Sequence, residues 1–209
     1  GRSDIPVGRP SDEILPIFRP PRPRRSVWFW QGPVISNGAG VVFEEAYATV
    51  PLTLPSHATI LTGRYPPEHG LRINGEGVLP ADVPTLAELL ARRGYRTGAF
   101  VSAFVLNRKF GLDRGFEIYD DELAGGAYVE TELYRSRPGA AAVDAAIEWL
   151  TGNRRGRFFC WVHLFDPHVP YDPHAELWGT RFADQPYDAE IAYVDLQVDR
   201  LMQFLRETG

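Results

Sequence analysis

The sequence predicts an α/β fold in which a mostly parallel sheet is covered by helices on both faces. Two compact apolar segments, residues 97–104 and 157–165, have the length and composition of buried strands. Segments with helical character lie before, between and after them, at residues 83–93, 139–150 and 190–207. Strands that alternate with helices are typical of parallel sheets, whose crossover helices cover both faces. In such sheets the reactive groups gather at the carboxyl ends of the strands.

A short strand-like segment and a short helix are expected ahead of the first buried strand. Residues 41–48 are apolar and β-prone. Residues 56–62 have the pattern of the first turns of a helix. Gly63 is the expected stop, because glycine readily adopts the left-handed conformation found at helix ends.

The helix over residues 83–93 has a predicted cap at each end. Asp82 is the expected N-cap, because its carboxylate can accept bonds from unpaired helical N–H groups, and Gly94 is the expected stop. The expected buried face consists of Leu86, Leu89 and Leu90. Residues 139–150 are rich in alanine. Apolar residues recur at spacings of three and four within residues 190–207, at Ile191, Val194, Val198, Leu201 and Leu205.

Composition excludes several classes of protein. The chain has 209 residues, of which 44% are hydrophobic and 23% charged, as in folded globular domains. Its net charge of −5 gives no basic footprint for nucleic acid, so no nucleic-acid partner is predicted. No apolar run approaches the roughly 20 residues of a membrane-spanning helix. One cysteine excludes an internal disulfide and a Cys-rich zinc site. The sequence assigns neither a compartment nor an oligomeric state.

Residues 1–39 differ in composition from the rest of the chain. They include six arginines and seven of the 18 prolines, a pattern that favours an irregular segment. A Pro-rich docking tail is one interpretation, and a solvated, non-native terminus is the favoured one. We therefore expect two regions: an irregular segment over residues 1–39, hypothesised to be a frame-shifted read, and a partial α/β domain over residues 40–209.

The segment most informative about chemistry runs from Pro51 to Gly63. Within it, Thr53 precedes a proline that can occupy the first turn of a helix. The Thr53 hydroxyl would then lie near a helix N-terminus, where free N–H groups and the helix dipole favour negative charge. That position suits a nucleophile and the oxygens of a phosphate or sulfate. The alternative is that Thr53 is only an N-cap, a role for which threonine is well suited.

This segment resembles the signature of the sulfatase family within the alkaline phosphatase superfamily. In that signature a Cys or Ser is followed by any residue, then Pro, Ser and usually Arg, and the stretch closes with Thr-Gly. The segment here runs Thr53-Leu54-Pro55-Ser56-His57 and closes at Thr62-Gly63. Further matches lie within residues 40–209, at residues 65–70, 84–90, 94–97, 111–116 and 163–171 and from Tyr187 onward. The resemblance implies an alkaline-phosphatase-like three-layer sandwich, of which the chain is expected to hold a part.

The residue at the nucleophile position departs from the family pattern. Sulfatases oxidise the Cys or Ser to formylglycine, whose hydrated aldehyde attacks sulfur. Thr53 carries a methyl group on its β-carbon and cannot give an aldehyde, but its hydroxyl can attack directly and form a phospho-threonine. Thr53 therefore favours hydrolysis or transfer of a phosphoester over that of a sulfate ester.

Two histidines are given roles by the resemblance. His57 stands where the family usually has Arg, and is a candidate for substrate binding; the alternative is a histidine on the helix surface. His168 matches the family histidine that contacts the ester oxygen, and it is the candidate general acid. The alternative is that His168 only packs against Trp161 or Tyr171.

The remaining candidates are weaker. His163 and Lys109 are further expected substrate contacts, although a solvated side chain is the alternative for Lys109. Asp166 is placed to orient one of the imidazoles of its loop. His69 and His174 are expected to lie in turns or on the surface.

By resemblance, the intact family binds a divalent metal such as calcium, magnesium, manganese or zinc. Its ligands come from an N-terminal Asp pair, the nucleophile segment and a late Asp motif that would lie beyond Gly209. Thr53 is the one ligand of this set that the chain provides, whereas a hard cation needs several oxygen ligands. We therefore expect this chain to bind no metal.

Two functions follow from these observations. The first is a sulfatase-like, metal-dependent enzyme that hydrolyses or transfers a small anionic sulfate or phosphate ester through Thr53. The second is a non-catalytic or truncated sulfatase-like domain that has lost its metal site. We expect the chain as given to be inactive and an intact parent to be active.

Overall fold

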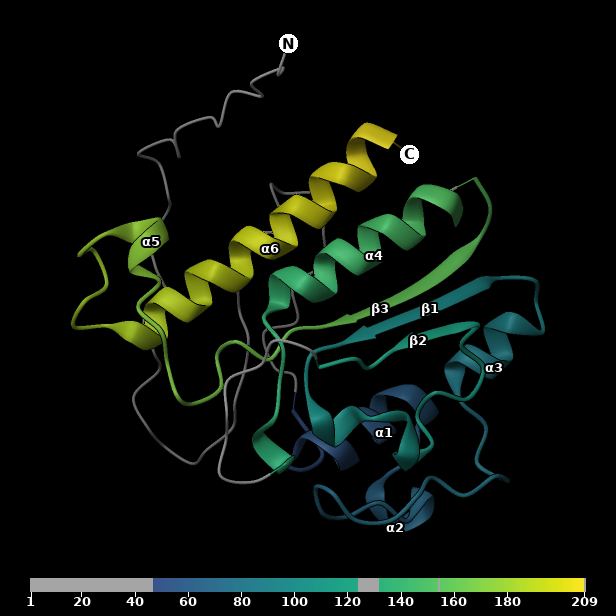
Figure 1. The fold of residues 1–209 in the computed structure, drawn as a ribbon. Coiled ribbons are helices and arrows are strands. Elements are labelled where there is room, and N and C mark those ends of the chain that lie inside the picture. The colour runs from purple at the N-terminus through teal and green to yellow at the C-terminus, as the bar shows by residue number, and fades with distance from the viewer. Residues whose placement is uncertain (1–46, 124–131, 154, 209) are drawn as a thin grey trace. The chain divides into compact units, whose positions relative to one another are not determined.

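A computed structural model describes residues 47–123, 132–153 and 155–208 (Figure 1). Most of the β-prone segment at residues 41–48 lies outside these ranges, as does the boundary expected after residue 39. The division into residues 1–39 and 40–209 therefore stays a prediction.

A parallel sheet of three strands lies at the centre of the described fold. Its strands are β1 (Arg96–Val101), β2 (Ile118–Asp120) and β3 (Phe158–His163), in the order β2-β1-β3, and both pairings are parallel. Val101 pairs with His163 and Phe100 with Asp120, so the three strands end side by side at one edge. The expected mostly parallel sheet is confirmed, and β2 is a strand that the sequence analysis did not predict.

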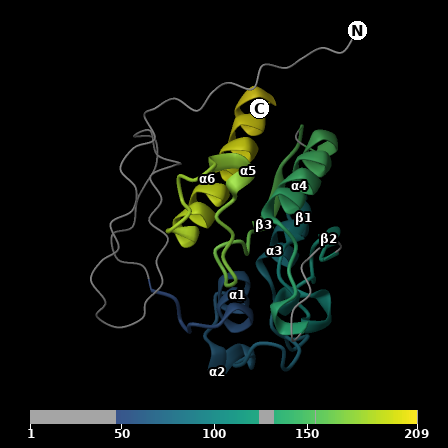
Figure 2. The same ribbon diagram turned by 60° about the vertical axis from the view of Figure 1, so that its left-hand side comes forward.

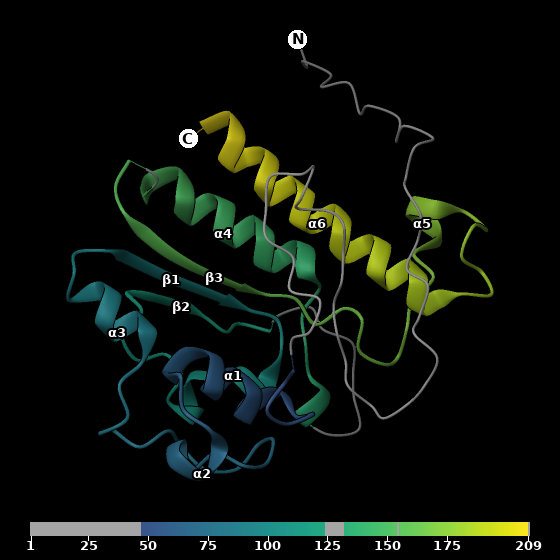
Figure 3. The ribbon, with the colours of Figure 1, turned by 180° about the vertical axis from the view of Figure 1, so that it is seen from behind.

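Helices cover the sheet on both faces (Figures 1 and 3). On one face lies α4 (Gly139–Asn153), which packs on Phe100 through Ala142 and Ala146 and is in turn covered by α6 (Pro186–Thr208). The opposite face is covered by α1 (Thr53–Thr62) and α3 (Leu86–Ala91), and α2 (Pro66–His69) packs against α1. Figure 2 shows the same layers from a second direction. The arrangement confirms the expected three-layer α/β architecture.

Alternation along the strands divides their side chains between the two faces. Ala99 and Val101 of β1 pack in the core beneath α1, whereas Phe100 packs beneath α4. Trp161 of β3 lies on the α1 side and Val162 on the α4 side. His163 follows Val162, so its side chain lies on the α1 side of the sheet, at the carboxyl end of β3.

The helix expected over residues 83–93 is shorter and is capped differently. α3 begins at Leu86, and its N-cap is Thr85, whose hydroxyl accepts the Glu88 N–H while the Glu88 carboxylate accepts the Thr85 N–H. The prediction of Asp82 as the cap was therefore wrong. The predicted buried face was wrong at Leu86 and Leu89, which are exposed, whereas Leu90 is half-buried and Ala87 is buried.

Three other predicted elements are present, but their ends or their buried residues differ from those expected. α1 ends as predicted before Gly63, which is left-handed, but it starts at Thr53. β3 is half-buried throughout because it forms an edge of the described sheet. On α6 the buried side includes the polar residues Glu190 and Gln197, which the expected apolar stripe did not include. Within the described residues, no helix has the length and apolarity that crossing a bilayer requires.

Candidate active site

Thr53 is the first residue of α1 and its side chain is half-buried. The N-cap position belongs to Leu52, whose extended backbone precedes the helix. The alternative in which Thr53 serves only as the N-cap is therefore wrong. Within the described part of the chain, the Thr53 hydroxyl makes no hydrogen bond.

The first turn of α1 offers fewer free N–H groups than the sequence predicted. Asn74 accepts the Leu54 N–H through its side-chain oxygen at 2.8 Å. Pro55 has no N–H, and the Ser56 N–H donates to the Leu52 carbonyl at 3.1 Å. Among the described residues, only the Thr53 N–H of this turn is left without a partner. The same Asn74 amide also carries two N–H donors, which lie beside the first turn.

Asn74 had no local signature in the sequence. Its partner lies 20 positions away along the chain, and the half-buried Asn74 reaches it only because the loop after α2 returns to α1. The dipeptide Asn74-Gly75 by itself is typical of a turn. Its proximity to the candidate nucleophile is a tertiary feature.

His57 lies one turn after Thr53 and faces the sheet. Its Nδ1–H donates to the Thr53 carbonyl at 2.8 Å, so the Nε2 of the neutral ring carries the lone pair. The His57 ring contacts Trp161, with centroids 5.8 Å apart. Burial lowers the pKa of His57, partly offset by its bond to Thr53. The alternative of a surface histidine is wrong, and a neutral His57 does not replace the charge of the Arg that the family usually has there.

His163, at the end of β3, lies edge-to-face with His57 at a centroid distance of 4.9 Å. Its Nδ1 is buried and has no hydrogen-bond partner in the described structure. Burial, followed by the neighbouring His57, holds the pKa of His163 well below 6.5. The pair is therefore neutral near physiological pH and offers nitrogen donors and lone pairs beside α1.

His168 lies on the loop that follows β3. Its ring stacks on Phe165 at 4.3 Å and lies 5.6 Å from Tyr134, so its packing partners differ from those expected. Its Nδ1–H donates to the Val169 carbonyl at 2.9 Å, which leaves Nε2 to hold a transferable proton in the imidazolium form. Phe165 in turn contacts His163 at 6.0 Å, so a continuous row of rings connects His168 to α1.

Lys109 does not join this row of rings. It is exposed, and its ammonium lies 4.0 Å from the ring centre of Phe104 and 5.0 Å from that of Phe110. The structure thus brings Thr53, His57 and His163 together, with His168 connected through Phe165. The assignment of Lys109 as a substrate contact stays a prediction.

The carboxylates at the end of β2 are already neutralised by arginines. Arg137, itself buried, contacts both oxygens of Asp120 at 3.0 and 2.9 Å. Arg108 pairs with Asp121 at 2.6 Å. Burial favours a raised pKa for Asp121, but the hydrogen bonds from Arg108 outweigh it and hold that pKa below its usual value. These groups stabilise the carboxyl edge of the sheet and are not free metal ligands.

Asp166 does not orient an imidazole, contrary to the prediction. Its Oδ1 accepts the N–H of Gly139, the first residue of α4, at 2.8 Å. Its Oδ2 is buried and has no hydrogen-bond partner in the described ranges, and burial raises the pKa of this carboxyl. Asp166 therefore ties the start of the loop to the N-terminus of α4, where a carboxylate is favoured.

His69 is fully buried, so its prediction as a turn or surface residue was wrong. Its Nδ1 accepts the Leu71 N–H, and its Nε2–H therefore donates to the Thr59 hydroxyl at 3.1 Å. Thr59 donates onward to the Pro55 carbonyl at 3.1 Å. His69 thus supports the turn of α1 that carries the candidate nucleophile.

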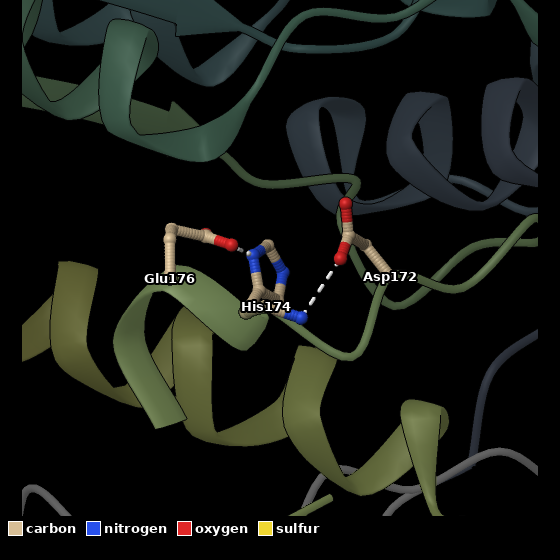
Figure 4. A group of neighbouring side chains, drawn as sticks. All are labelled: Asp172, His174 and Glu176. Atoms are coloured by element: carbon tan, nitrogen blue, oxygen red, sulfur yellow. Dashed lines mark hydrogen bonds and ion pairs between the residues drawn. The ribbon is translucent and has the colours of Figure 1, made fainter. Parts of the chain in front are cut away.

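One group of three potential metal ligands occurs in the described ranges: Asp172, His174 and Glu176, whose ligand atoms lie within 4.8 Å of one another (Figure 4). Both ring nitrogens of His174 are engaged, Nδ1 with Glu176 at 3.3 Å and Nε2 with Glu190 at 3.1 Å. The Asp172 carboxylate points to the backbone N–H of His174 rather than to its ring. The described residues therefore do not fit a divalent cation, which needs several converging free oxygen ligands.

His174 was also expected to be a surface or turn residue. Its ring is mostly buried, lying between Glu176 and Glu190 and stacked on Tyr193 at 4.3 Å. Although burial opposes the charged ring, the hydrogen bonds to the glutamates raise the pKa of His174. The residue is therefore part of an organised contact with α6.

Comparisons with known proteins identify related sequences. A family model described as Sulfatase matches residues 33–209. An N-acetylglucosamine-6-O-sulfatase of Bacteroides thetaiotaomicron is 26% identical over 159 residues, covering 70% of this chain and 28% of the relative. The chain thus spans less than a third of that protein.

Solved structures confirm the fold. A structure from glycosaminoglycan metabolism in Bacteroides thetaiotaomicron matches with a TM-score of 0.60 at 16% identity, covering 78% of this chain and 47% of the other. A protein of the alkaline phosphatase superfamily from Vibrio parahaemolyticus matches with a TM-score of 0.52 at 17% identity, covering 76% and 40%. The described domain has the alkaline-phosphatase-like fold, and it is a partial one.

Proposed function

Because the chain belongs to the sulfatase family, we propose that it carries the nucleophile segment of a hydrolase for small anionic esters, with Thr53 as the attacking residue. The observation that carries this proposal is the position of Thr53 at the N-terminus of α1, with its hydroxyl unbonded within the described ranges. The Asn74 amide and the His57–His163 pair lie around it.

In this proposal the Thr53 hydroxyl releases its proton to solvent water as its oxygen attacks the phosphorus or sulfur and forms a covalent threonine ester. The ester bond to the leaving alcohol breaks, and a protonated His168 donates its Nε2 proton to the departing oxygen. Water then hydrolyses the threonine ester and releases phosphate or sulfate. The Thr53 N–H and the Asn74 amide, which lies beside the first turn of α1, are the donors proposed for the transferred group.

Thr53 favours a phosphoester substrate. Its β-carbon carries a methyl group, so it cannot form the aldehyde hydrate used by formylglycine sulfatases. Sulfatases generally use a divalent metal, but the described residues do not fit one. His57 and His163 add no fixed positive charge, so an anionic substrate needs further cationic groups outside the described site.

A second candidate is a binding domain without catalysis. It is supported by the neutral histidine pair and by the ion pairs of Arg108 with Asp121 and of Arg137 with Asp120, which leave neither carboxylate free to bind a metal. Such a domain would bind phosphate or sulfate without turning an ester over. Isothermal titration calorimetry with inorganic phosphate and turnover assays separate the two candidates: a binding domain binds phosphate and shows no turnover.

The decisive experiment is Thr53→Ala in the full-length protein. Nitrophenyl phosphate and nitrophenyl sulfate turnover should fall by at least about 1,000-fold, because the nucleophile is lost, while the melting temperature stays nearly constant. Mass spectrometry of the acid-quenched wild-type enzyme should find the covalent ester on Thr53.

Thr62→Ala is the matched control. Thr62 lies on the same helix, and its hydroxyl donates to the Ala58 carbonyl. This variant should keep turnover within about 2-fold, since only two local bonds are lost, to the Ala58 carbonyl and from the Arg64 N–H. Full turnover by Thr53→Ala would remove Thr53 from the mechanism.

A further inference from the structure

The loop that carries His168 is attached to a helix at each end. At its start, Asp166 accepts the Gly139 N–H of α4 at 2.8 Å. Toward its far end, the ring of Tyr171 contacts that of Tyr187 on α6, with centroids 5.2 Å apart. His168 therefore lies between two anchor points that belong to different helices.

At the far end of the His168 loop, Glu190 of α6 makes a second contact besides that between Tyr171 and Tyr187. Glu190 is only 4% exposed. Its Oε1 accepts the Asp172 N–H at 2.8 Å, and its Oε2 pairs with His174 Nε2 at 3.1 Å. Each carboxylate oxygen thus holds a different residue of the loop. We call Asp172, His174 and Glu190 the loop latch.

Two further features fix His174 within the loop latch. Its ring stacks on Tyr193, nearly parallel at 9° and with centroids 4.3 Å apart, so the imidazole lies flat along α6. Its backbone is left-handed, with φ of 47°, and it is the only described residue other than glycine with a positive φ. A non-glycine residue in this region carries strain that the surrounding contacts must offset.

The loop latch contains the buried carboxylate of Glu190, and removing a carboxylate from water costs free energy. A buried carboxylate without partners is strongly destabilising, whereas Glu190 is satisfied only when Asp172 and His174 occupy their observed positions. A loop conformation that withdraws these residues while Glu190 stays buried leaves the acid unpaired. Glu190 therefore selects one loop conformation out of many.

We propose that Glu190 is a positioning residue that holds the loop in the conformation where His168 stacks on Phe165, next to His163. This proposal rests on the proposed function, in which His168 protonates the leaving group. Glu190 does not touch the substrate; it acts through the backbone of the loop. Substitution of Glu190 removes the contacts with Asp172 and His174, and His168 can then move away from Phe165.

The first experiment measures the loop without using activity. Hydrogen exchange of residues 166–174 is compared in the full-length protein for Glu190→Ala, Glu190→Gln and Glu176→Ala. Glu190→Ala should speed exchange in this segment by at least about 10-fold, because the buried acceptor is gone. Glu190→Gln should restore much of the protection, since its amide oxygen still accepts the Asp172 N–H.

Glu176→Ala is the matched control, because Glu176 also contacts His174 but its side chain is 67% exposed. It should leave exchange of the segment nearly unchanged. If Glu190→Ala does not fold, His174→Ala breaks the loop latch from the loop side and should speed exchange in the same way. Unchanged exchange in the folded Glu190 or His174 variants would overturn the proposal.

The second experiment separates positioning from a general loss of stability. Glu190→Ala should lower kcat by about 10-fold for alkyl phosphates, whose leaving groups need a proton, and by about 2-fold or less for nitrophenyl phosphate, with KM nearly constant. In a double-mutant cycle, Glu190→Ala should add little to His168→Ala, because both remove the same proton donor.

Equal losses for both substrates, or additive effects with His168→Ala, would overturn the positioning role. The proposed function itself is tested apart from it. If Thr53→Ala keeps its turnover, the assignment of the nucleophile fails, while the exchange experiment still decides whether Glu190 holds the loop.

Discussion

At Asn74 a side chain from a distant loop does what a local N-cap does in most helices. Leu52, at the N-cap of α1, has no polar side chain to accept a helical N–H. Asn74 supplies the acceptor for the Leu54 N–H, at 2.8 Å. Its oxygen therefore serves the stability of α1, and its NH₂ group remains available to an anion beside Thr53.

Substitutions at Asn74 can separate these two roles. Asn74→Ala should lower the free energy of unfolding by about 1 kcal/mol, the usual cost of losing a helix cap, and should also reduce kcat/KM. Asn74→Asp keeps an acceptor but replaces the two N–H donors with negative charge. It should recover the stability and not the turnover, as measured by urea unfolding and nitrophenyl phosphate kinetics; recovery of both would argue against an amide contact with substrate.

At the scale of elements, α3 depends on the close approach of a glycine. Gly115 has a φ of 86°, and a Cβ built on it would overlap the backbone of Ala87 and Glu88 in α3. Thr85, the N-cap of this helix, also donates its hydroxyl to the Arg114 carbonyl at 2.7 Å. The turn at residues 114–115 and the N-terminus of α3 therefore form one packed unit.

Gly115→Ala should destabilise the protein by about 3 kcal/mol, since it combines strain from a positive φ with a clash against backbone that cannot move aside. Gly152→Ala is the matched substitution. Gly152 lies in α4, and a Cβ there meets no atom within 4 Å. It should stabilise by up to about 1 kcal/mol through helix propensity. Urea denaturation of both variants checks the contrast, and a similar change in the two would contradict it.

At the scale of the whole molecule, buried neutral histidines couple stability to pH. Burial lowers the pKa of His57, His69 and His163 below 6.5. Below that pH the unfolded chain takes up protons that the native state does not, so their stabilising contribution is present above pH 6.5 and is lost as the pH falls. His174 has a raised pKa, so its contribution is complete below 6.5 and is lost only as the pH rises through that raised value.

The contribution of these histidines to the free energy of unfolding should therefore fall as the pH drops below 6.5. The buried carboxyls of Asp166, Glu190 and Asp195, whose pKa values burial raises, oppose this loss at lower pH. Urea unfolding at a series of pH values measures this slope. His163→Gln removes one of the titrating groups and should make the slope shallower. The same slope in the wild type and in His163→Gln would show that His163 does not contribute to it.

Local chemistry explains which parts of the fold could be predicted from the sequence. The stop of α1 at Gly63 and the extent of α4 from Gly139 follow from residues within each segment. β1 and β3 follow from compact apolar runs that are long enough to be buried. β2 has only three residues, Ile118–Asp120, and it exists because its backbone pairs with β1. Such a short strand has no periodicity to detect.

The sequence by itself determined the parallel α/β architecture, the motif around Thr53 and the resemblance to sulfatases, because these depend on residues that are near one another in the chain. Only the tertiary structure decided that Asn74 caps α1, that His57 and His163 form a neutral pair, that Asp166 holds α4 and that Glu190 holds the loop. Each of these contacts joins segments that are distant in sequence. A polar side chain becomes a cap, a pair or an anchor only when folding removes it from water and brings its partner within hydrogen-bonding distance or ring contact.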